Sequence, residues 1–410
     1  MDVLIIGAGV GGLTLGLMLH EAGIPCRIYE AAPEIKPLGV GINLLPHAMK
    51  ELSALGLEET LAAGGVATAE AVFFNRFGQL IYQEPLGRAA GYGWPQISIH
   101  RGDLQAALLN AFIARAGADR LMLGWQCTKA EDIGDAAVAH FRRMVTQEAL
   151  PPQRGAAIIA CDGIHSTVRK QLYPDEGEPI YSGVNMWRGV TRWKPILSGA
   201  AMIRAGWFTH AKIVIYPIRN DIDAEGRQLV NWVVEIATSK YERWNWSRTA
   251  NVGDFLKPMV DWHFDWLDVP EFLRGSEIAL EYPMVDKDPL PRWSFGRITL
   301  LGDAAHPMYP RGSNGAGQAI LDARALADRL AGADAVAALA AYDERRREAT
   351  ANVVRTNRTT PPDAILGEVH RRSGDKPFAS IDDIISRAEL VAITDAYKRV
   401  AGYEKDKLRR

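Results

Sequence analysis

The first thirty residues constrain the fold more than any other stretch of the chain. A short apolar run leads directly into Gly7-x-Gly9-x-x-Gly12, a helix pattern follows, and a second apolar run ends in Glu30. A strand, a tight glycine turn, a helix and a second strand form the sequence signature of a dinucleotide-binding unit. This order of elements therefore predicts a parallel α/β fold.

Each glycine has a physical role in such a turn. One makes the turn, one lets the backbone approach a pyrophosphate, and one packs the helix against the strand. The free N–H groups and the positive dipole end of the helix then face the phosphates. Glu30, eighteen residues after Gly12, is placed to accept hydrogen bonds from ribose hydroxyls. We therefore expect a dinucleotide site rather than a chance glycine-rich turn.

The same segment contains an uncharged run from Val3 to Leu19 that resembles a membrane or signal segment. A signal peptide would begin with a basic region, whereas the second residue here is Asp2. The five glycines in the run also make a poor membrane-spanning helix. We expect no targeting segment, no membrane partner and a cytoplasmic protein.

Composition excludes several classes of function. The 410 residues are enough for two domains, and 47 basic against 49 acidic residues imply no general attraction to nucleic acid. Cys26, Cys127 and Cys161 are widely spaced, with no CxxC motif and no His/Cys cluster. We therefore expect neither a disulfide framework nor a metal site, and interpret the cysteines as buried thiols.

Nucleotide-binding patterns occur in separated pieces of the chain, with a β-rich stretch between the last two. Nine of the eleven tryptophans lie between Trp187 and Trp293, which indicates either an aromatic-lined pocket or a packed sheet. Within this stretch we expect one helix over 255–266. Further along, the charged run 343–348 is interpreted as a solvated helix face, and the tail as two amphipathic helices that form a lid or an oligomer contact.

These patterns predict a nucleotide-binding domain assembled around an inserted, mostly antiparallel β-sheet domain for the substrate. The predicted divisions are 1–72, 97–176 and 283–360 for the nucleotide-binding domain, 73–96 and 177–282 for the β-sheet domain, and 361–410 for a C-terminal helical extension.

Three signatures occur together over residues 1–360: the glycine turn with Glu30, Asp162-Gly163, and Gly302-Asp303 followed by His-Pro. In combination they resemble the class A, single-component FAD-dependent aromatic monooxygenases, which are built like p-hydroxybenzoate hydroxylase. Further short stretches are similar to the phenazine hydroxylases within that family: 37–43, 98–102, 186–191, 282–286 and 314–316. The resemblance implies a Rossmann-type, glutathione reductase-like FAD-binding domain.

The resemblance also implies roles for individual residues. The glycine turn and Glu30 would hold the ADP half of FAD, Asp303 would accept a hydrogen bond from the ribityl chain, and Asp162-Gly163 belong to a motif linked to both FAD and NAD(P)H. Pro307 would lie beside the flavin ring. The residues assigned to cofactor binding are Gly7, Gly9, Gly12, Glu30, Gly41, Arg101, Gln105, Asp162, Gly163, Arg169, Gly302, Asp303, Pro307, Gly312, Asn314, Gly315 and Ala316.

One loop departs from the family pattern. Ser313 stands where a glycine is common, and Arg311 follows Pro310 where an apolar residue would be ordinary. Arg311 either meets an acidic group of the substrate or lies on the surface.

The single dinucleotide fingerprint indicates that FAD is held tightly and that NAD(P)H docks transiently. We hypothesise that NAD(P)H reduces FAD, and that O₂ adds at flavin C4a to give a hydroperoxide that hydroxylates a phenazine-, pyridine- or phenol-like ring. Water must be excluded from such a site. Tyr216, His210 and Arg188 are possible substrate contacts, although the favoured interpretation of each is a satisfied sheet residue. We expect no catalytic side chain, a structural role for His306, and a monomer or homodimer.

Three alternatives share parts of these signatures. A flavin-dependent halogenase would carry Trp-x-Trp-x-Ile-Pro, and Trp244-x-Trp246 lacks the Ile-Pro. An isoprenoid reductase uses the same FAD signatures. A non-enzymatic binder like the GDP-dissociation inhibitors would not need Asp162-Gly163 or Gly302-Asp303.

Overall fold

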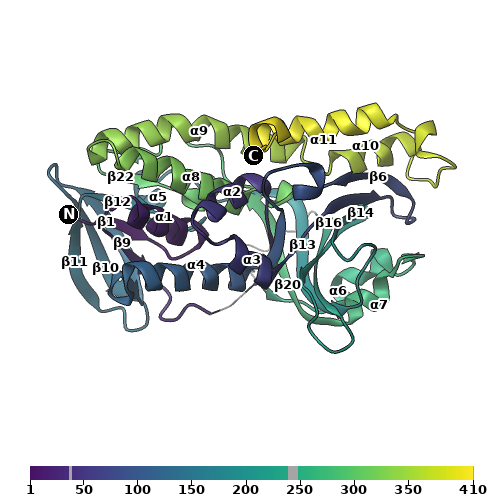
Figure 1. Cartoon of the computed structure of the whole chain (residues 1–410), viewed down its shortest axis with the longest axis horizontal. Coiled ribbons are helices and arrows are strands. Elements are labelled where there is room, and N and C mark those ends of the chain that lie inside the picture. Colours follow the sequence, from purple (N-terminus) through teal and green to yellow (C-terminus); the bar gives the residue numbers. More distant parts are fainter. Residues whose placement is uncertain (37–38, 239–247, 410) are drawn as a thin grey trace.

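The computed structural model describes residues 1–36, 39–238 and 248–409. The molecule is elongated, with an α/β domain at one end, a domain built on a large β-sheet at the other, and C-terminal helices along one long side (Figure 1). Pro37-Leu38 and Trp244-x-Trp246, both noted in the sequence, lie outside the described residues. The predicted fold class is confirmed: an α/β domain joined to a mostly antiparallel sheet and followed by helices.

The α/β domain is organised around strand β1 (Val3–Ile6), which is buried over its whole length. It pairs in parallel with β2 (Cys26–Glu30) on one side and with β12 (Ala157–Ala160) on the other. A parallel sheet needs helices on both faces, which explains why these strands are continuous apolar runs. The full sheet order is β21 (Ser294–Phe295), β22 (Ile298–Leu300), β12, β1, β2, β8 (Leu121–Leu123).

Helix α1 (Val10–Glu21) is the central helix of this domain and packs against α4 (Arg101–Ala116) and α8 (Gly315–Leu330). Gly16 lets α1 and α4 approach closely, because a Cβ there would lie 2.8 Å from the ring of Phe112. The remaining elements of this half are α2 (Pro46–Ala54), α3 (Glu58–Gly64), α5 (Thr167–Leu172), α9 (Ala335–Thr359), and the antiparallel strands β9 (Trp125–Asp132), β10 (Ala137–Arg143) and β11 (Ala149–Gly155).

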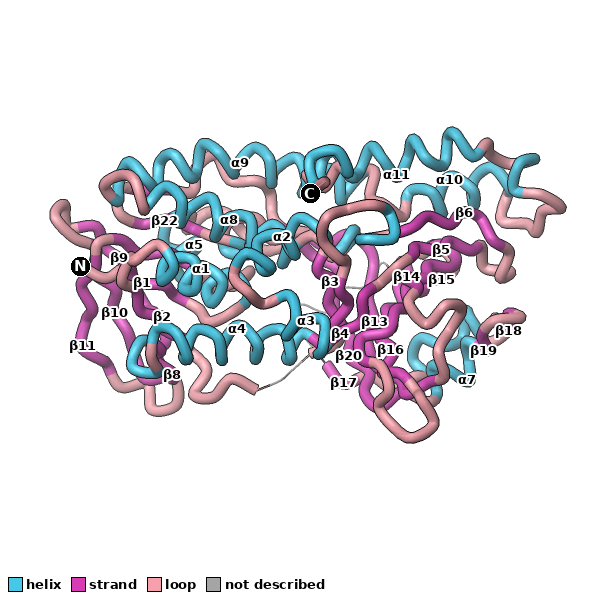
Figure 2. The backbone as a smooth tube through the Cα atoms, in the orientation of Figure 1, coloured by secondary structure: helices cyan, strands magenta, loops and turns pink. Residues whose placement is uncertain are grey.

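The second domain is an eight-stranded sheet (magenta at the right of Figure 2). Its core is aromatic: the rings of Trp187 and Phe255 stack 5.4 Å apart, and Trp232 and Trp262 are buried beside them. The strand order is β17 (Arg248–Thr249), β20 (Ser276–Asp286), β13 (Ile180–Trp193), β16 (Gln228–Ala237), β15 (Ala211–Arg219), β14 (Ala201–Trp207), β5 (Glu70–Phe74), β6 (Leu80–Pro85). A small sheet of β3 (Gly41–Leu44), β7 (Ile97–His100) and β4 (Gly65–Ala67) lies between the domains.

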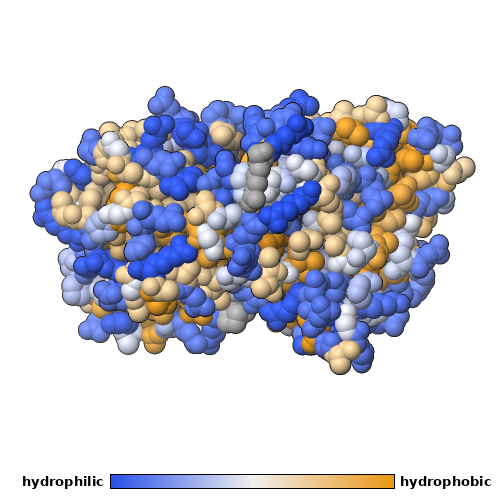
Figure 3. All heavy atoms as spheres, viewed as in Figure 1, coloured by the Kyte–Doolittle hydropathy of each residue, from blue (hydrophilic) through white to orange (hydrophobic). Residues whose placement is uncertain are grey.

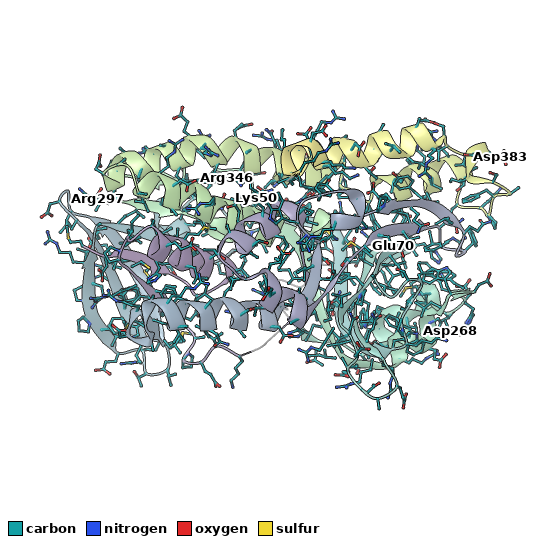
Figure 4. All side chains as sticks on the ribbon, in the orientation of Figure 1. Lys50, Glu70, Asp268, Arg297, Arg346 and Asp383 are labelled. Carbon is teal, nitrogen blue, oxygen red and sulfur yellow. The ribbon has the colours of Figure 1, made fainter. Side chains whose placement is uncertain are left out.

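Two local predictions are wrong. Residues 255–266 do not form one helix, because Pro258 interrupts it: α6 (Gly253–Leu256) and a 3-10 turn (Lys257–Met259) are followed by the β18 (His263–Phe264) and β19 (Leu267–Asp268) hairpin, and then by α7 (Val269–Arg274). The run 343–348 is not uniformly solvated. Asp343 is buried and accepts hydrogen bonds from the backbone N–H groups of Trp293 and Ser294. Arg346, labelled in Figure 4, belongs to α9, and its guanidinium donates to Asp322 on α8.

The C-terminal helices α10 (Ala364–Ser373) and α11 (Arg387–Ala401) join the two domains. Tyr397 of α11 donates a hydrogen bond to Asn357 Oδ1 (2.7 Å) and accepts one from Asn314 Nδ2 (2.9 Å) in the α/β half. On the sheet side, Lys398 pairs with Glu84 of β6 at 2.7 Å. The tail is therefore part of the core arrangement and covers both halves.

Hydrophilic residues cover most of the face drawn in Figure 3, and hydrophobic residues reach the surface mainly toward the β-sheet end. None of the described helices combines the length and the apolar character needed to cross a bilayer.

Replacing Tyr397 with Phe tests how the tail is held. The change removes the hydroxyl and leaves the buried Asn357 Oδ1 without its donor, while Asn314 Nδ2 keeps only its bond to the carbonyl of Gly312; this costs roughly 1–3 kcal/mol. Denaturant unfolding should show this loss of stability. Tyr173→Phe is the matched control, because its hydroxyl bonds an exposed backbone carbonyl of Arg292 and should cost well under half as much. Equal losses in both variants would contradict the role given to Tyr397.

Candidate functional site

The glycine turn has an interlocked backbone. A Cβ on Gly7, whose φ is +104°, would lie 2.5 Å from the carbonyl oxygen of Cys161, and a Cβ on Gly12 would lie 2.0 Å from the carbonyl oxygen of Gly7. Gly9 differs: its φ is −75°, and a Cβ there would meet nothing within 4 Å. Gly7 and Gly12 are therefore required by the fold itself, whereas Gly9 borders open space.

Glu30 and Gln105 hold this turn from the side. The Glu30 carboxylate accepts hydrogen bonds from the backbone N–H groups of Ala8 and Ala32, each at 2.8 Å. Gln105 Nε2, on α4, donates to the carbonyl of Ala8 at 2.8 Å. The carboxylate thus has a fixed orientation at the end of β2.

The Asp162-Gly163 segment follows β12. Asp162 Oδ2 accepts a hydrogen bond from the backbone N–H of Thr167, while Oδ1 is buried with no partner among the residues that the structure describes. Burial raises the pKa of the Asp162 carboxyl, and hydrogen bonds from Ser166 and from backbone N–H groups oppose this rise. A buried carboxylate oxygen without a partner fits a site that receives a donor from a ligand.

The Arg169 side chain contacts other parts of the protein rather than the proposed ligand side of Asp162. Its guanidinium pairs with Glu176 and donates to the carbonyls of Ala304 and Ala305 at 3.0 and 2.9 Å. It therefore fastens helix α5 to the segment after β22, and holds the backbone that carries Asp303.

His306 has the structural role expected for it. Its Nε2 lies 2.5 Å from Asp322 Oδ2, and Arg346 donates to the other oxygen of Asp322 at 2.7 Å. Burial alone would raise the pKa of Asp322, but the neighbouring His306 and Arg346 outweigh it and hold that pKa below its usual value. This buried group fixes the start of the loop that leads to Arg311.

A cavity of about 390 Å³ lies where the glycine turn, the 302–316 loop and the large sheet meet. Thirteen of the predicted site residues line it: Gly9, Gly41, Arg101, Gly163, Arg188, Tyr216, Gly302, Asp303, Arg311, Gly312, Asn314, Gly315 and Ala316. The others lie outside its lining: Gly7, Gly12, Glu30, Gln105, Asp162, Arg169, Pro307 and His210. Predicted site residues that are far apart in the sequence therefore line one cavity.

His210 is directed elsewhere in the β-sheet domain. Its Nε2 lies 2.9 Å from the carbonyl of Pro258, and its ring stacks on Trp262. The described tryptophans likewise pack in the sheet domain or the α/β core, and none of them lines the cavity. Of the two interpretations of the tryptophan density, the packed sheet fits the described residues.

The sheet wall of the cavity is apolar along one part and cationic along another. Met186, Val214 and Val233 belong to the apolar part. In the cationic part, Arg188 donates to the carbonyl of Gly41 at 3.1 Å, and its Nε is buried with no partner among the described residues. Arg188 therefore has donor capacity directed at a ligand.

Sequence reasoning missed a buried ionic cluster beside this wall. Lys212 pairs with Glu235 (2.8 Å) and with Asp363, and Arg204 pairs with Asp363 at 2.9 Å. All four residues are buried, and Lys212 is only 1% exposed. The available signal was the position of Arg204, Lys212 and Glu235 inside otherwise apolar strand runs, where a charge needs a buried partner.

The chain is similar to known FAD-binding proteins over most of its length. The FAD binding domain family model matches residues 1–357. The phenazine 1,6-dicarboxylic acid hydroxylase of Lysobacter antibioticus is 41% identical over 97% of both chains. The 6-hydroxynicotinate 3-monooxygenase of Pseudomonas fluorescens is 30% identical over 86% of this chain and 89% of that protein.

Two solved structures have a similar fold. Klebsiella pneumoniae HpxO complexed with FAD and uric acid has a TM-score of 0.75 at 22% identity, covering 98% of this chain and 95% of that one. A salicylate hydroxylase substrate complex has a TM-score of 0.74 at 22% identity, covering 100% and 97%.

Gly9 and Gly12 give a matched pair of substitutions for the cofactor site. Gly12→Ala should prevent the turn from forming, because its Cβ would overlap the Gly7 carbonyl oxygen. Gly9→Ala should leave the stability of the FAD-free protein within about 1 kcal/mol of the wild type, since its φ suits alanine. FAD affinity should nevertheless fall by about tenfold or more, because the backbone must approach a pyrophosphate there. Fluorescence titration of FAD and denaturant unfolding measure both; unchanged affinity in Gly9→Ala would contradict the assignment.

His47, on α2 beneath α8, predicts a pH dependence of stability. Burial lowers its pKa to about 3, and nearby Arg346 adds to this effect. Between pH 6.5 and 3 the unfolded state therefore binds a proton that the folded state does not, so stability falls as pH falls. At pH 5 this costs about 2 kcal/mol. His47→Gln should lose correspondingly less stability than the wild type between pH 7 and 5, whereas the exposed substitution His20→Gln should follow the wild type.

Proposed function

Because the chain belongs to the family of FAD-dependent aromatic monooxygenases, we propose that it hydroxylates the ring of an aromatic or N-heteroaromatic acid, consuming NAD(P)H and O₂. The family model covers most of the chain, and the relative from Lysobacter is similar over nearly its whole length. The proposal adds the substrate class and the residues that recognise it.

The residues present fit FAD. The turn at Gly9 leaves open space at the N-terminus of α1, where backbone N–H groups favour phosphate, and Asp303 lines the same cavity at the end of β22. Glu30, held by the turn itself, is available to ribose hydroxyls at the end of β2. When bound, FAD supplies the redox chemistry that activates O₂, and the protein supplies position and dryness.

One observation carries the substrate class: the charges on the sheet side of the cavity do not balance. Arg188, Arg204 and Arg311 line the cavity and Lys212 lies behind the lining, so four cations stand against the two anions Glu235 and Asp363. Arg101 and Asp303, which also line the cavity, are exposed and add no net charge. Two positive charges in a confined site need compensation, because a buried unpaired charge is costly. A ring carrying carboxylate groups supplies that compensation, and its apolar body suits Met186, Val214 and Val233.

The substrates named for relatives agree with this chemistry. Phenazine 1,6-dicarboxylic acid, 6-hydroxynicotinate and 3-amino-4-hydroxybenzoate are all ring acids. A phenazine dicarboxylate matches both surplus charges, and we propose this type of substrate for the chain.

Tyr216 acts as a hydrogen-bond donor to the substrate. Burial raises the pKa of its phenol, and the opposing effect of Arg188 is smaller. The hydroxyl therefore keeps its proton at neutral pH and orients an acceptor on the ring or its carboxylate. We propose no side chain as a general base.

NAD(P)H docks transiently in this proposal, and the protein works in the cytoplasm as a monomer or homodimer. The deciding experiment uses purified FAD-loaded protein with phenazine-1,6-dicarboxylate. We expect substrate-stimulated NAD(P)H oxidation, and incorporation of one ¹⁸O atom from labelled O₂ into the product. Peroxide as the only oxygen product across phenazine, pyridine and phenol acids would reject the function. A halogenated product, or a reduced one without new oxygen, would favour the halogenase or reductase alternative.

Arg188→Gln tests carboxylate recognition. Loss of a charge-assisted hydrogen bond of roughly 1.5–3 kcal/mol should raise KM for the phenazine dicarboxylate by about 10–100-fold. Activity toward phenazine without carboxylates should change little. Arg192→Gln is the matched control, because Arg192 is on the same strand but exposed and paired with Glu277. Equal increases in KM for rings with and without carboxylates would contradict the role of Arg188 in carboxylate recognition.

A further inference from the structure

A second cavity of about 450 Å³ lies beneath the C-terminal helices. Its walls come from β5 and β6 of the large sheet, from the 3-10 turn Gly87–Ala90, from α11 and from the 3-10 turn Lys405–Leu408. We call this space the vestibule. Its floor includes the buried side chains of Phe73, Tyr82 and Met202, and its rim includes the exposed side chains of Arg399 and Lys405.

The vestibule and the candidate active-site cavity meet. Arg204, Gly312 and Ser313 line both of them. The Arg204 guanidinium lies over the ring of Phe73, with 5.2 Å from Cζ to the ring centroid, and its Nε lies 2.9 Å from Asp363. A layer about one side chain thick therefore separates the two spaces, and it carries a positive charge.

The acidic side chains that line the vestibule all take part in ion pairs. Glu84 and Asp395 share Lys398, at 2.7 and 3.0 Å. The two other acids are paired within the terminal 3-10 turn and its flanks: Glu404 with Lys407 and Asp406 with Arg409. These four acids are paired with three cations, so one negative charge is left among them.

The cations of the lining are different. Arg387, Arg399 and Lys405 form no ion pair with any residue that the structure describes, and all three are exposed. Arg387 lies over the ring of Tyr82, with 5.5 Å from Cζ to the ring centroid. Opposite these charges, Phe73, Tyr82 and Tyr403 offer aromatic surfaces. The opening thus combines uncompensated positive charge with flat apolar surface.

We propose that the vestibule is the route by which an anionic aromatic substrate reaches the active-site cavity, with the C-terminal helix α11 as its outer wall. The rim cations attract the carboxylates, the aromatic floor accepts the ring, and Arg204 is the first buried cation that an incoming carboxylate meets. The tail thereby favours substrates that enter the vestibule quickly, and Arg188 then recognises their carboxylates in the active-site cavity. This inference rests on the proposed substrate class.

The steering part is tested by stopped-flow mixing of phenazine-1,6-dicarboxylate with oxidised, FAD-loaded protein, followed by the change in flavin absorbance. In the triple variant Arg387→Gln, Arg399→Gln, Lys405→Gln the association rate constant should fall about tenfold at low ionic strength. Its dependence on salt should weaken, and the dissociation rate constant should stay near the wild-type value. Arg329→Gln, which removes an exposed arginine of α8 outside the vestibule, should leave both constants unchanged.

The route itself is tested by filling the vestibule. Ala90→Trp places a large side chain on the lining, whereas Ala89→Trp places it on the exposed neighbour outside the lining. An obstruction in the route slows the entry and the exit of the substrate equally. Ala90→Trp should therefore lower both rate constants by about tenfold and leave the dissociation constant nearly unchanged. Ala89→Trp should behave as the wild type.

The outcomes separate the two proposals. A normal flavin response in the wild type, with unchanged rates in both the triple variant and Ala90→Trp, would overturn the vestibule and leave the substrate class standing. No response of the wild type to any ring acid would reject the substrate class, and the vestibule proposal with it.

Discussion

The buried charge of Lys212 is the constraint on which the arrangement of the two halves depends. It lies on an inner strand of the large sheet and is 1% exposed, so its ammonium must be compensated inside the protein. Glu235 from the neighbouring strand supplies one carboxylate, and Asp363 supplies another from 151 residues further along the chain. Burial alone would raise the pKa of Asp363, but Lys212 and Arg204 outweigh it and hold that pKa below its usual value.

This ionic contact explains why the tail follows the path it does. Asp363 precedes α10 directly, so pairing with Lys212 fixes where the helices α10 and α11 begin to cross the sheet. Removing one member of a buried pair costs roughly 3–5 kcal/mol, far more than an exposed pair is worth. Once α10 is placed, Tyr397 reaches Asn314 in the loop that lines the active-site cavity. The ion pair between Lys212 and Asp363 at the large sheet thus also positions the tail for its hydrogen bond to Asn314 in the α/β domain.

Sequence patterns predicted the α/β half well, because its strands, turns and helices are determined mainly by residues that are close together in the sequence. The run Val3–Ile6, the glycine turn and the helix after it each depend on near neighbours in sequence, and the structure has them in the predicted places. Likewise, Gly302-Asp303 follows a buried strand, which is enough to place it at a strand end. What the sequence could not show was which distant charges meet: Lys212 lies inside an apolar strand run and needs a buried partner, but no local pattern identifies Asp363 as that partner. The partners of Arg169 could not be predicted for the same reason, since Glu176 and the carbonyls of Ala304 and Ala305 are brought to it by the tertiary fold.

The same cluster decides what charge the active-site cavity presents. Were Asp363 and Glu235 absent, Arg204 in the lining and Lys212 behind it would add to Arg188 and Arg311, and the sheet side of the cavity would have four uncompensated charges. With the two carboxylates in place, the surplus is two, which a ring with two carboxylates cancels without leaving a buried charge of either sign. A neutral phenol would leave the surplus in place and would lose the gain from charge-assisted hydrogen bonds. Under the proposed function, the residue that joins the tail to the sheet therefore also sets the net charge that the ligand must compensate, so stability and substrate recognition depend on one carboxylate.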